Sequence, residues 1–308
     1  MYNEERKQEF LKQKSFNANL LSVFNLVEAR ETMYGRDLCE WNSDQILQFY
    51  RYFSTGKLQT LIVINTALRD YASWCILNGM VPDNQNHYAE LGTDALLKCI
   101  NMGVLAETVI TYAKLQDLLN RMVNACDKFI VLGLFEGIPL TDNAMGSVKV
   151  TDLDGNQLHL VTGKILTVSD QLKNIILDAS EEEACKYEGD KPRKDKIYVP
   201  SEYILRHTRT SVKNDSPIMT PVAITRRLRN RIRKLEVFSY SPTVKSFQES
   251  GRIYYIRKHI METYGIGFEE AIFNKKYRAM HETIYGEIQN MSYYMQTYGV
   301  VVEQLKEL

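Results

Sequence analysis

Residues 147–168 read SVKVTDLDGNQLHLVTGKILTV, and this stretch decides the fold class. Two turn signals, Asp154-Gly155-Asn156 and Thr162-Gly163-Lys164, divide it into three short runs rich in β-branched and apolar residues. Such runs, separated by turns that contain glycine, are typical of antiparallel hairpins. The stretch therefore predicts a small three-stranded antiparallel sheet.

Helical patterns precede this sheet. The first hundred residues predict a compact bundle of four or five helices, the longest over 58–77, with Asn78-Gly79 as its stop signal. A helix from about 43 would be capped by Asn42 or Ser43. A single long helix is expected from about Thr111 to Gly137, directly before the sheet.

Helical patterns also follow the sheet. A helix is expected from Ser169 to about Tyr187, a short extended segment at 197–200, and several helices after Pro217. The predicted fold class is therefore mainly α with a small antiparallel β-sheet. We expect two domains, a helical one over 1–108 and an α+β one over 109–308.

The bulk composition is that of an ordinary globular protein, with 308 residues and no net charge. The charged N-terminus predicts no signal peptide, and no apolar run is long enough to span a bilayer. Five scattered cysteines indicate reduced thiols in a cytoplasmic protein. The histidines lack metal-ligand spacing, so no metal and no cofactor is expected.

A strongly basic helix is expected over 221–235, PVAITRRLRNRIRKL. Thr220 is suited to the N-cap and Pro221 to the first helical position. Leu228, Ile232 and Leu235 form one apolar stripe, and the arginines around it predict a guanidinium face toward solvent. Such a face suits phosphate, and nucleic acid is the polyanion it most often meets.

Charge is segregated along the chain. The segment 186–234 holds fourteen Lys and Arg against five Asp and Glu, a net charge of +9, so the remainder carries −9. A segregated field of this kind can steer an anionic partner even though the whole chain is neutral.

The order of elements resembles that of the tyrosine recombinases, the phage integrase family. Residues 43–79 look like the core-binding domain of that family, and VLGLFEGIPL (131–140) lies where the family has G-L-R-x-S-E-L. Lys164 lies where the family has a β-hairpin lysine. The segment SPTVKSFQESG (241–251) resembles the family's H-x-L-R-H segment.

The catalytic positions implied by this resemblance are degenerate. Recombinase chemistry needs a tyrosine nucleophile and two arginines that stabilise the scissile phosphate. The first arginine position holds Phe135, next to Glu136, and the second motif falls on residues 245–249, including Lys245, Gln248 and Glu249. Four tyrosines lie near the expected nucleophile and are interpreted as core or interface aromatics: Tyr285, Tyr293, Tyr294 and Tyr298.

The whole pattern is most similar to the lytic-cycle repressors of SPbeta-type Bacillus phages, through YGRDLCEW, WCILNGMVPDNQNHY and ESGRIYYIRK. This resemblance implies a sequence-specific repressor of double-stranded operator DNA that maintains lysogeny. It also implies that the protein is not an enzyme. The resemblance leaves three questions open: how the repressor is released from DNA, whether a protein antagonist or co-regulator binds it, and what its oligomeric state is.

The alternative is an active or partly active recombinase. The chain contains a literal L-R-H-T at 205–208, so Arg206 and His207 could form the second motif with Tyr240 as nucleophile. Against this, only 71 residues separate Phe135 from Arg206, and the first arginine would still be missing. We therefore interpret the segment as a basic surface loop that contacts phosphate.

The expected contacts with duplex DNA are basic side chains and one serine. They would bind phosphate for affinity, and some could read guanine in the major groove. The candidates are Arg226, Arg227, Arg229, Arg231, Arg233, Lys234, Lys164, Arg206, Arg209, Lys245, Ser246, Arg252, Arg257 and Lys258. RNA binding and a scaffold without nucleic-acid contact are the remaining alternatives, although no RNA-binding motif is present.

Overall fold

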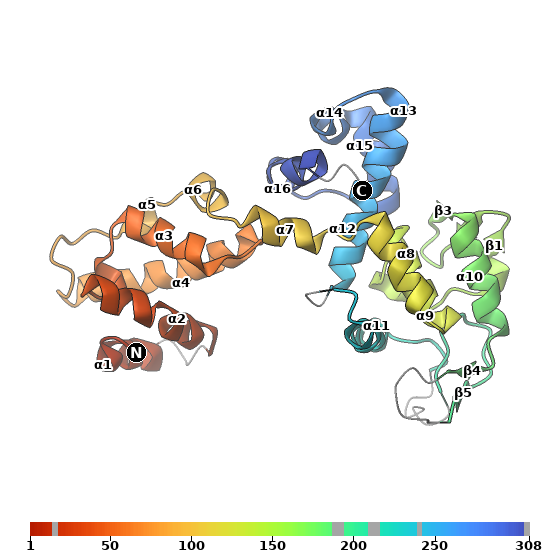
Figure 1. The fold of residues 1–308 in the computed structure, drawn as a ribbon, viewed down its shortest axis with the longest axis horizontal. Helices are drawn as coiled ribbons and strands as arrows, with labels where there is room; N and C mark the ends of the chain where they lie inside the picture. The colour runs from red at the N-terminus through yellow and green to blue at the C-terminus, as the bar shows by residue number, and fades with distance from the viewer. Residues whose placement is uncertain (14–17, 187–193, 209–215, 239–241, 305–308) are drawn as a thin grey trace. The chain divides into compact units, whose positions relative to one another are not determined.

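The computed structural model describes residues 1–13, 18–186, 194–208, 216–238 and 242–304. The chain divides into two compact units, residues 1–107 (unit 1) and 108–308 (unit 2), which are described separately (Figure 1). The fold is mainly helical with a small antiparallel sheet in unit 2, so the predicted fold class is confirmed.

Unit 1 is helical throughout its described part. Its elements are α1 (Glu4–Gln13), α2 (Ala18–Tyr34), the 3-10 helix η1 (Leu38–Glu40), α3 (Ser43–Phe53), α4 (Leu58–Leu77), α5 (His87–Glu90), α6 (Thr93–Leu97) and α7 (Met102–Thr108). Helix α4 has the predicted bounds. Asn42, rather than Ser43, caps α3, because its side chain accepts from Gln45 N at 3.0 Å in a reciprocal capping box.

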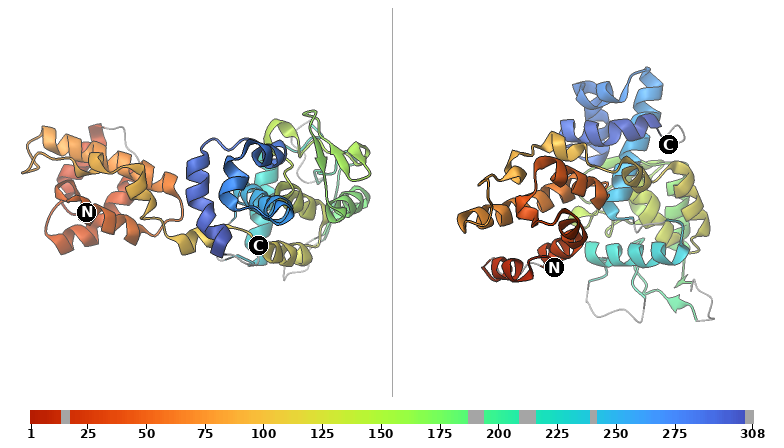
Figure 2. Two further views of the ribbon diagram at one scale, coloured as in Figure 1. Left: turned by 90° about the horizontal axis from the view of Figure 1, so that it is seen from above. Right: turned by 60° about the vertical axis from the view of Figure 1, so that its left-hand side comes forward.

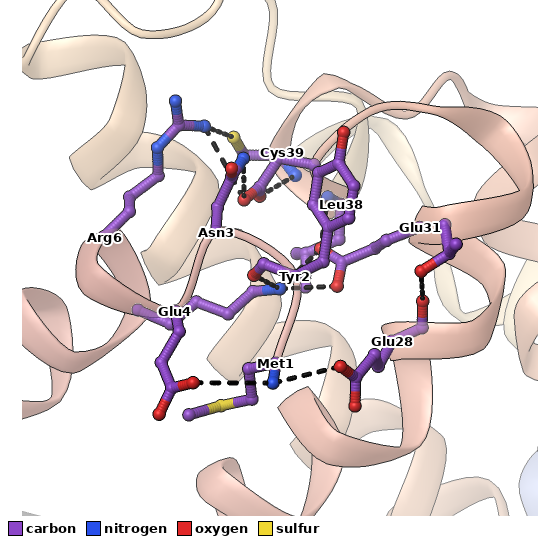
Figure 3. Close-up of polar contacts among 12 residues, drawn as sticks. Met1, Tyr2, Asn3, Glu4, Arg6, Glu28, Glu31, Leu38 and Cys39 are labelled. Atoms are coloured by element: carbon purple, nitrogen blue, oxygen red, sulfur yellow. Dashed lines mark hydrogen bonds and ion pairs between the residues drawn. The ribbon is translucent and has the colours of Figure 1, made fainter.

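A buried ion pair joins α1 to α2 in unit 1 (Figure 3). The Lys7 ammonium and the Glu31 carboxylate are fully buried and lie 2.5 Å apart. Glu31 also accepts from Leu38 N at 2.9 Å, and Lys7 donates to Tyr2 O at 2.8 Å. Burial raises the pKa of Glu31 to about 7, against the opposing effect of Lys7. The pair therefore fixes how the N-terminal helices pack.

Unit 2 contains the sheet and nine α-helices in its described part. The elements up to the second strand pair are α8 (Tyr112–Arg121), α9 (Ala125–Phe135), η2 (Thr141–Asn143), η3 (Val150–Asp152), β1 (Leu153–Asp154), β2 (Gln157–His159), β3 (Ile165–Thr167), α10 (Asp170–Glu181), β4 (Ala184–Cys185) and β5 (Lys196–Ile197). They are followed by α11 (Pro221–Leu235), α12 (Val244–Tyr255), the π-helix η4 (Ile256–Met261), α13 (Glu262–Tyr264), α14 (Phe268–Phe273), α15 (Lys275–Tyr285) and α16 (Met291–Gln304).

The three-stranded sheet has the order β1-β2-β3, all antiparallel, as predicted. Gly155 turns β1 into β2 with a φ of 58°, a conformation that favours glycine. The first strand is shorter than expected, because residues 150–152 form a 3-10 turn in which Asp152 accepts from Lys149 N at 2.8 Å. Helix α10 is capped by Ser169 as predicted but ends at Glu181, before the expected end at Tyr187.

The expectation of one helix from Thr111 to Gly137 is wrong, because α8 ends at Arg121 and α9 begins at Ala125. The carboxylate of Glu182 accepts from the N–H groups of Ala125 and Cys126 at 2.8 and 3.2 Å. It thereby satisfies donors that a helix start leaves open. The side-chain amide of Asn124 donates to Lys186 O at 3.1 Å and accepts from Lys186 N at 2.6 Å, which holds the break in place.

Helix α9 forms the centre of unit 2, and α10, α11 and α12 all contact it. Its side chains from Phe129 to Phe135 are buried, so the helix is apolar on every side. Helices α12, η4 and α13 follow one another without interruption from 244 to 264. Figure 2 shows α14, α15 and α16 gathered beside them.

Candidate nucleic-acid interface

Helix α11 begins and packs as its sequence predicts. The Thr220 hydroxyl accepts from Ala223 N at 3.3 Å, and Pro221 occupies the first turn. Ile224, Leu228 and Ile232 are buried in the core of unit 2. This stripe orients the helix, and it decides which basic side chains reach solvent.

Two of the arginines on α11 point inward, so the expectation that they face solvent is wrong for Arg227 and Arg231. Arg227 Nε lies 2.5 Å from Asp127 Oδ1, and Arg231 Nε lies 2.9 Å from Asp127 Oδ2. Each arginine side chain is 14% exposed, and Asp127 is 2% exposed. Arg227 also donates to the hydroxyl of Tyr198 at 3.0 Å. The two guanidinium groups neutralise a carboxylate that α9 buries.

The other four basic residues of α11 are exposed: Arg226, Arg229, Arg233 and Lys234. Arg226, Arg229 and Arg233 are spaced three and four residues apart, so they share one face of the helix. We call these three residues the arginine stripe. Its guanidinium groups are available to phosphate or to base edges, as the sequence predicted for the helix as a whole.

Three other expected DNA contacts instead cap the ends of helices. Arg206 is 9% exposed and donates to Ala179 O at 2.6 Å and to Glu182 O at the end of α10. Arg252 is 5% exposed and donates to Tyr285 O at 2.6 Å and Gly286 O at 2.9 Å at the end of α15. Basic side chains often satisfy the last carbonyls of a helix in this way. The interpretation of Arg206 as part of a surface loop is therefore wrong.

Lys164 is the third of these residues. Its ammonium donates to Ile284 O, also at the end of α15, and burial together with Arg252 lowers its pKa. The β-hairpin lysine is thus tied to a main-chain carbonyl of its own unit. The sequence near Lys164 does not predict this contact, because its partner lies 120 residues further along the chain.

The remaining candidates lie on or near α12. Lys245 is exposed on the first turn, while the hydroxyl of Ser246 accepts from Thr243 N at 3.2 Å in the capping box of that helix. Lys258 is exposed and pairs with Glu262 at 2.7 Å, and Arg257 is half-buried. Arg209 and Tyr240 lie outside the described residues.

The positions that the recombinase resemblance assigned to catalysis come together in unit 2. Phe135 is 2% exposed at the end of α9, and Tyr285 at the end of α15 donates its hydroxyl to Phe135 O at 2.9 Å. Gly251 of α12 packs so closely on Phe135 O that any Cβ there would clash. We call this group, with Lys164 and Arg252, the closed site. Burial raises the pKa of Tyr285 well above its ordinary value.

The two carboxylates near the closed site, those of Glu136 and Glu249, are partly buried. Glu136 accepts from the main-chain N–H and the hydroxyl of Ser169 at 2.8 and 2.5 Å, and burial raises its pKa. One oxygen of Glu249 is buried without a hydrogen-bond partner. Gln248, at the second arginine position, is half-buried. Neither arginine that the chemistry needs is present at these positions.

The described residues contain neither a group of metal ligands nor a membrane-spanning helix. Among them, no three His, Cys, Asp or Glu side chains gather as a metal would require. Within the same ranges, no helix combines the length and hydropathy needed to cross a bilayer.

The chain has the tyrosine recombinase and integrase fold, a helical unit followed by an α+β unit in which a helix end, a hairpin lysine and a tyrosine meet. Sequence models of one family match both units: "MrpR, N-terminal core-binding domain" over 1–77 and "MrpR, C-terminal catalytic domain" over 109–300. Because these matches cover more than half of the chain, the protein belongs to the MrpR family.

The chain is also similar to individual proteins. The "SPbeta prophage-derived uncharacterized protein YopR" of Bacillus subtilis (strain 168) is 27% identical over 230 residues, 70% of each chain. The XerA recombinase structure is 10% identical, covers 98% of this chain and 96% of its own, and has a TM-score of 0.43. A lambda integrase structure bound to DNA is 13% identical, covers 92% and 97%, and has a TM-score of 0.37. At such TM-scores, the family assignment rests on the sequence matches.

Proposed function

We propose that this protein is a sequence-specific repressor that binds double-stranded operator DNA of a phage and does not cut it. The observation that carries the proposal is the contrast at the arginine positions. Phe135 and Gln248 replace both catalytic arginines, whereas the arginine stripe of α11 stays exposed. Without the two guanidinium groups, negative charge on a scissile phosphate has no stabilising partner. The prophage origin of the relative supports a role in a phage.

Binding to DNA follows from the charge and spacing of the arginine stripe. Three guanidinium groups on one helix face can each neutralise a phosphate. Because each neutralised phosphate releases counterions, the affinity for DNA falls as the salt concentration rises. One or more of the guanidinium groups would read guanine, which gives about 1–3 kcal/mol of discrimination for each bidentate contact. Lys234, Lys245, Arg257 and Lys258 are kept as further candidates, because their side chains are exposed or half-buried. Arg227, Arg231, Arg206, Arg252 and Lys164 are not, because Asp127 or main-chain carbonyls of unit 2 hold their charged groups inward.

The proposal is tested by recovering and sequencing the fragments of sheared phage and host DNA that stay bound over a salt series. A few enriched fragments that share a short motif are expected. With the variant Arg226→Gln/Arg229→Gln/Arg233→Gln, these fragments should no longer be enriched. The slope of the logarithm of the binding constant against the logarithm of the salt concentration should become shallower by about 3. The matched Lys variant keeps the charge and should keep the slope while losing discrimination. Uniform weak recovery, unchanged in the Gln variant, would contradict the proposal.

A further inference from the structure

A basic cavity lies beside α11, away from the closed site. It has a volume of about 730 Å³ and is bounded by β4, β5, the segment 206–208 and one side of α11 from its first turn to its last. Figures 1 and 2 show the β4–β5 pair next to this helix. The volume falls in the range of pockets that hold small ligands.

The charge of the cavity is almost all of one sign. Lys186, Lys194 and Lys196 line it from β4, β5 and the residues beside them, and Arg226 lines it from α11. None of the described residues that line it is Asp or Glu. Within the described part of the chain, these three lysines form no ion pair. The inward pair of Arg227 and Arg231 adds two fixed guanidinium groups, of which Asp127 neutralises about one charge.

The walls of the cavity are held by main-chain contacts. Lys186 is fixed through its main chain to Asn124 at 2.6 and 3.1 Å, and Lys196 pairs with Cys185 across the β4–β5 ladder. Lys186 and Lys196 therefore project from positioned backbone. Met219, Val222 and Ala223 supply an apolar surface between the charges. A cation cluster with an apolar wall suits a ligand that joins phosphates to a planar or apolar group.

We propose that this cavity binds two or three adjacent phosphate groups, either of a free nucleotide-like polyphosphate or of a nucleic-acid backbone. Adjacent phosphates match the three lysines because each exposed ammonium can neutralise one phosphate charge. The inference does not depend on the repressor role. Arg226 belongs both to the cavity and to the arginine stripe, so a free polyphosphate held there competes with DNA for this side chain.

Cys185 supplies a readout that is independent of DNA affinity. It lines the cavity and lies 2.9 Å from Arg231 Nη2, and the other four cysteines are buried. Alkylation by iodoacetamide, a neutral reagent, is therefore expected mainly at Cys185. The measurement is the rate of this alkylation, followed by mass spectrometry, with and without a phosphate probe at constant ionic strength.

The probes are inorganic triphosphate, ATP and a 12-base-pair duplex. In the wild type, at least one should slow alkylation of Cys185 about five-fold or more. Protection by triphosphate or ATP identifies a free polyphosphate as the source, and protection by the duplex alone identifies the DNA backbone. The variant Lys186→Gln/Lys194→Gln/Lys196→Gln should lose the protection.

The control variant, Arg229→Gln/Arg233→Gln, changes the arginine stripe but no residue that lines the cavity. It should weaken operator binding and leave protection by triphosphate or ATP unchanged, so failure of the two proposals is distinguishable. If none of the three probes slows alkylation of wild-type Cys185, the phosphate-binding cavity is overturned. Equal protection in the triple lysine variant would overturn it as well.

Discussion

The arginine stripe and the closed site use the same kinds of residue in opposite ways. On α11, Asp127 holds Arg227 and Arg231 inward, and Arg226, Arg229 and Arg233 remain exposed. At the closed site, the basic groups donate to carbonyls at the end of α15, and a phenylalanine fills the position of an arginine. The comparison shows that an acceptor within reach, either a carboxylate or a main-chain carbonyl, can hold a basic side chain inside unit 2, whatever the local sequence predicts for it.

The largest expected effect comes from removing the acid under α11. In Asp127→Ala, two buried guanidinium groups lose their counter-ion, which should cost about 3–5 kcal/mol of unfolding free energy. Urea denaturation measures this loss. The matched control is Asp117→Ala, which breaks an exposed pair with Arg121 and should cost less than about 0.5 kcal/mol. Equal losses in the two variants would show that Arg227 and Arg231 do not depend on Asp127.

A second prediction concerns pH and the helices behind the closed site. Burial, together with the charges of Arg252 and Arg278, lowers the pKa of His281 to about 4. The unfolded chain therefore binds this proton more tightly than the folded chain. The contribution of neutral His281 to the free energy of unfolding is complete above about pH 6.5. As the pH falls toward 4, this contribution of about 3 kcal/mol is lost. Urea denaturation from pH 7 to 4 should show this loss in the wild type and less of it in His281→Leu. Parallel curves for the two proteins would contradict the assignment.

The smallest effect separates the two regions most cleanly. Tyr285→Phe removes the hydrogen bond to Phe135 O and should cost about 1 kcal/mol of stability without changing DNA affinity. Arg229→Gln should do the reverse, since its side chain is exposed. Thermal unfolding and a DNA mobility shift, measured on both variants, give the comparison. A loss of DNA affinity in Tyr285→Phe would mean that the closed site takes part in binding.

Local sequence signals predicted much of the fold. The run over 58–77, the turn at Gly155 and the cap at Thr220 depend on neighbouring residues, and the structure has all three. The break between α8 and α9 was missed because Glu182, which caps α9, lies 57 residues beyond Ala125. Helix propensity contains no information about such a partner.

The site was harder to predict for the same reason. Arg227 meets Asp127 across 100 residues, and Arg252 meets Tyr285 across 33. One signal was present, because Asp127 is the only acid in the apolar run ACDKFIVLGLF, and a buried acid requires a cation. Arg227 and Arg231 also lie three residues after Ile224 and Leu228, at the edge of the buried stripe. Together these features would have marked the two inward arginines.

One measurement tests the central claim that the arginine stripe binds DNA while the closed site does not cut it. A labelled operator duplex with a nick near its centre is incubated with wild-type protein, and the sample is divided between a native gel and a denaturing gel. We expect a shifted complex on the native gel, lost in Arg226→Gln/Arg229→Gln/Arg233→Gln, and no protein-linked DNA on the denaturing gel. A covalent adduct mapped to a tyrosine, or an unchanged shift in the variant, would contradict the claim.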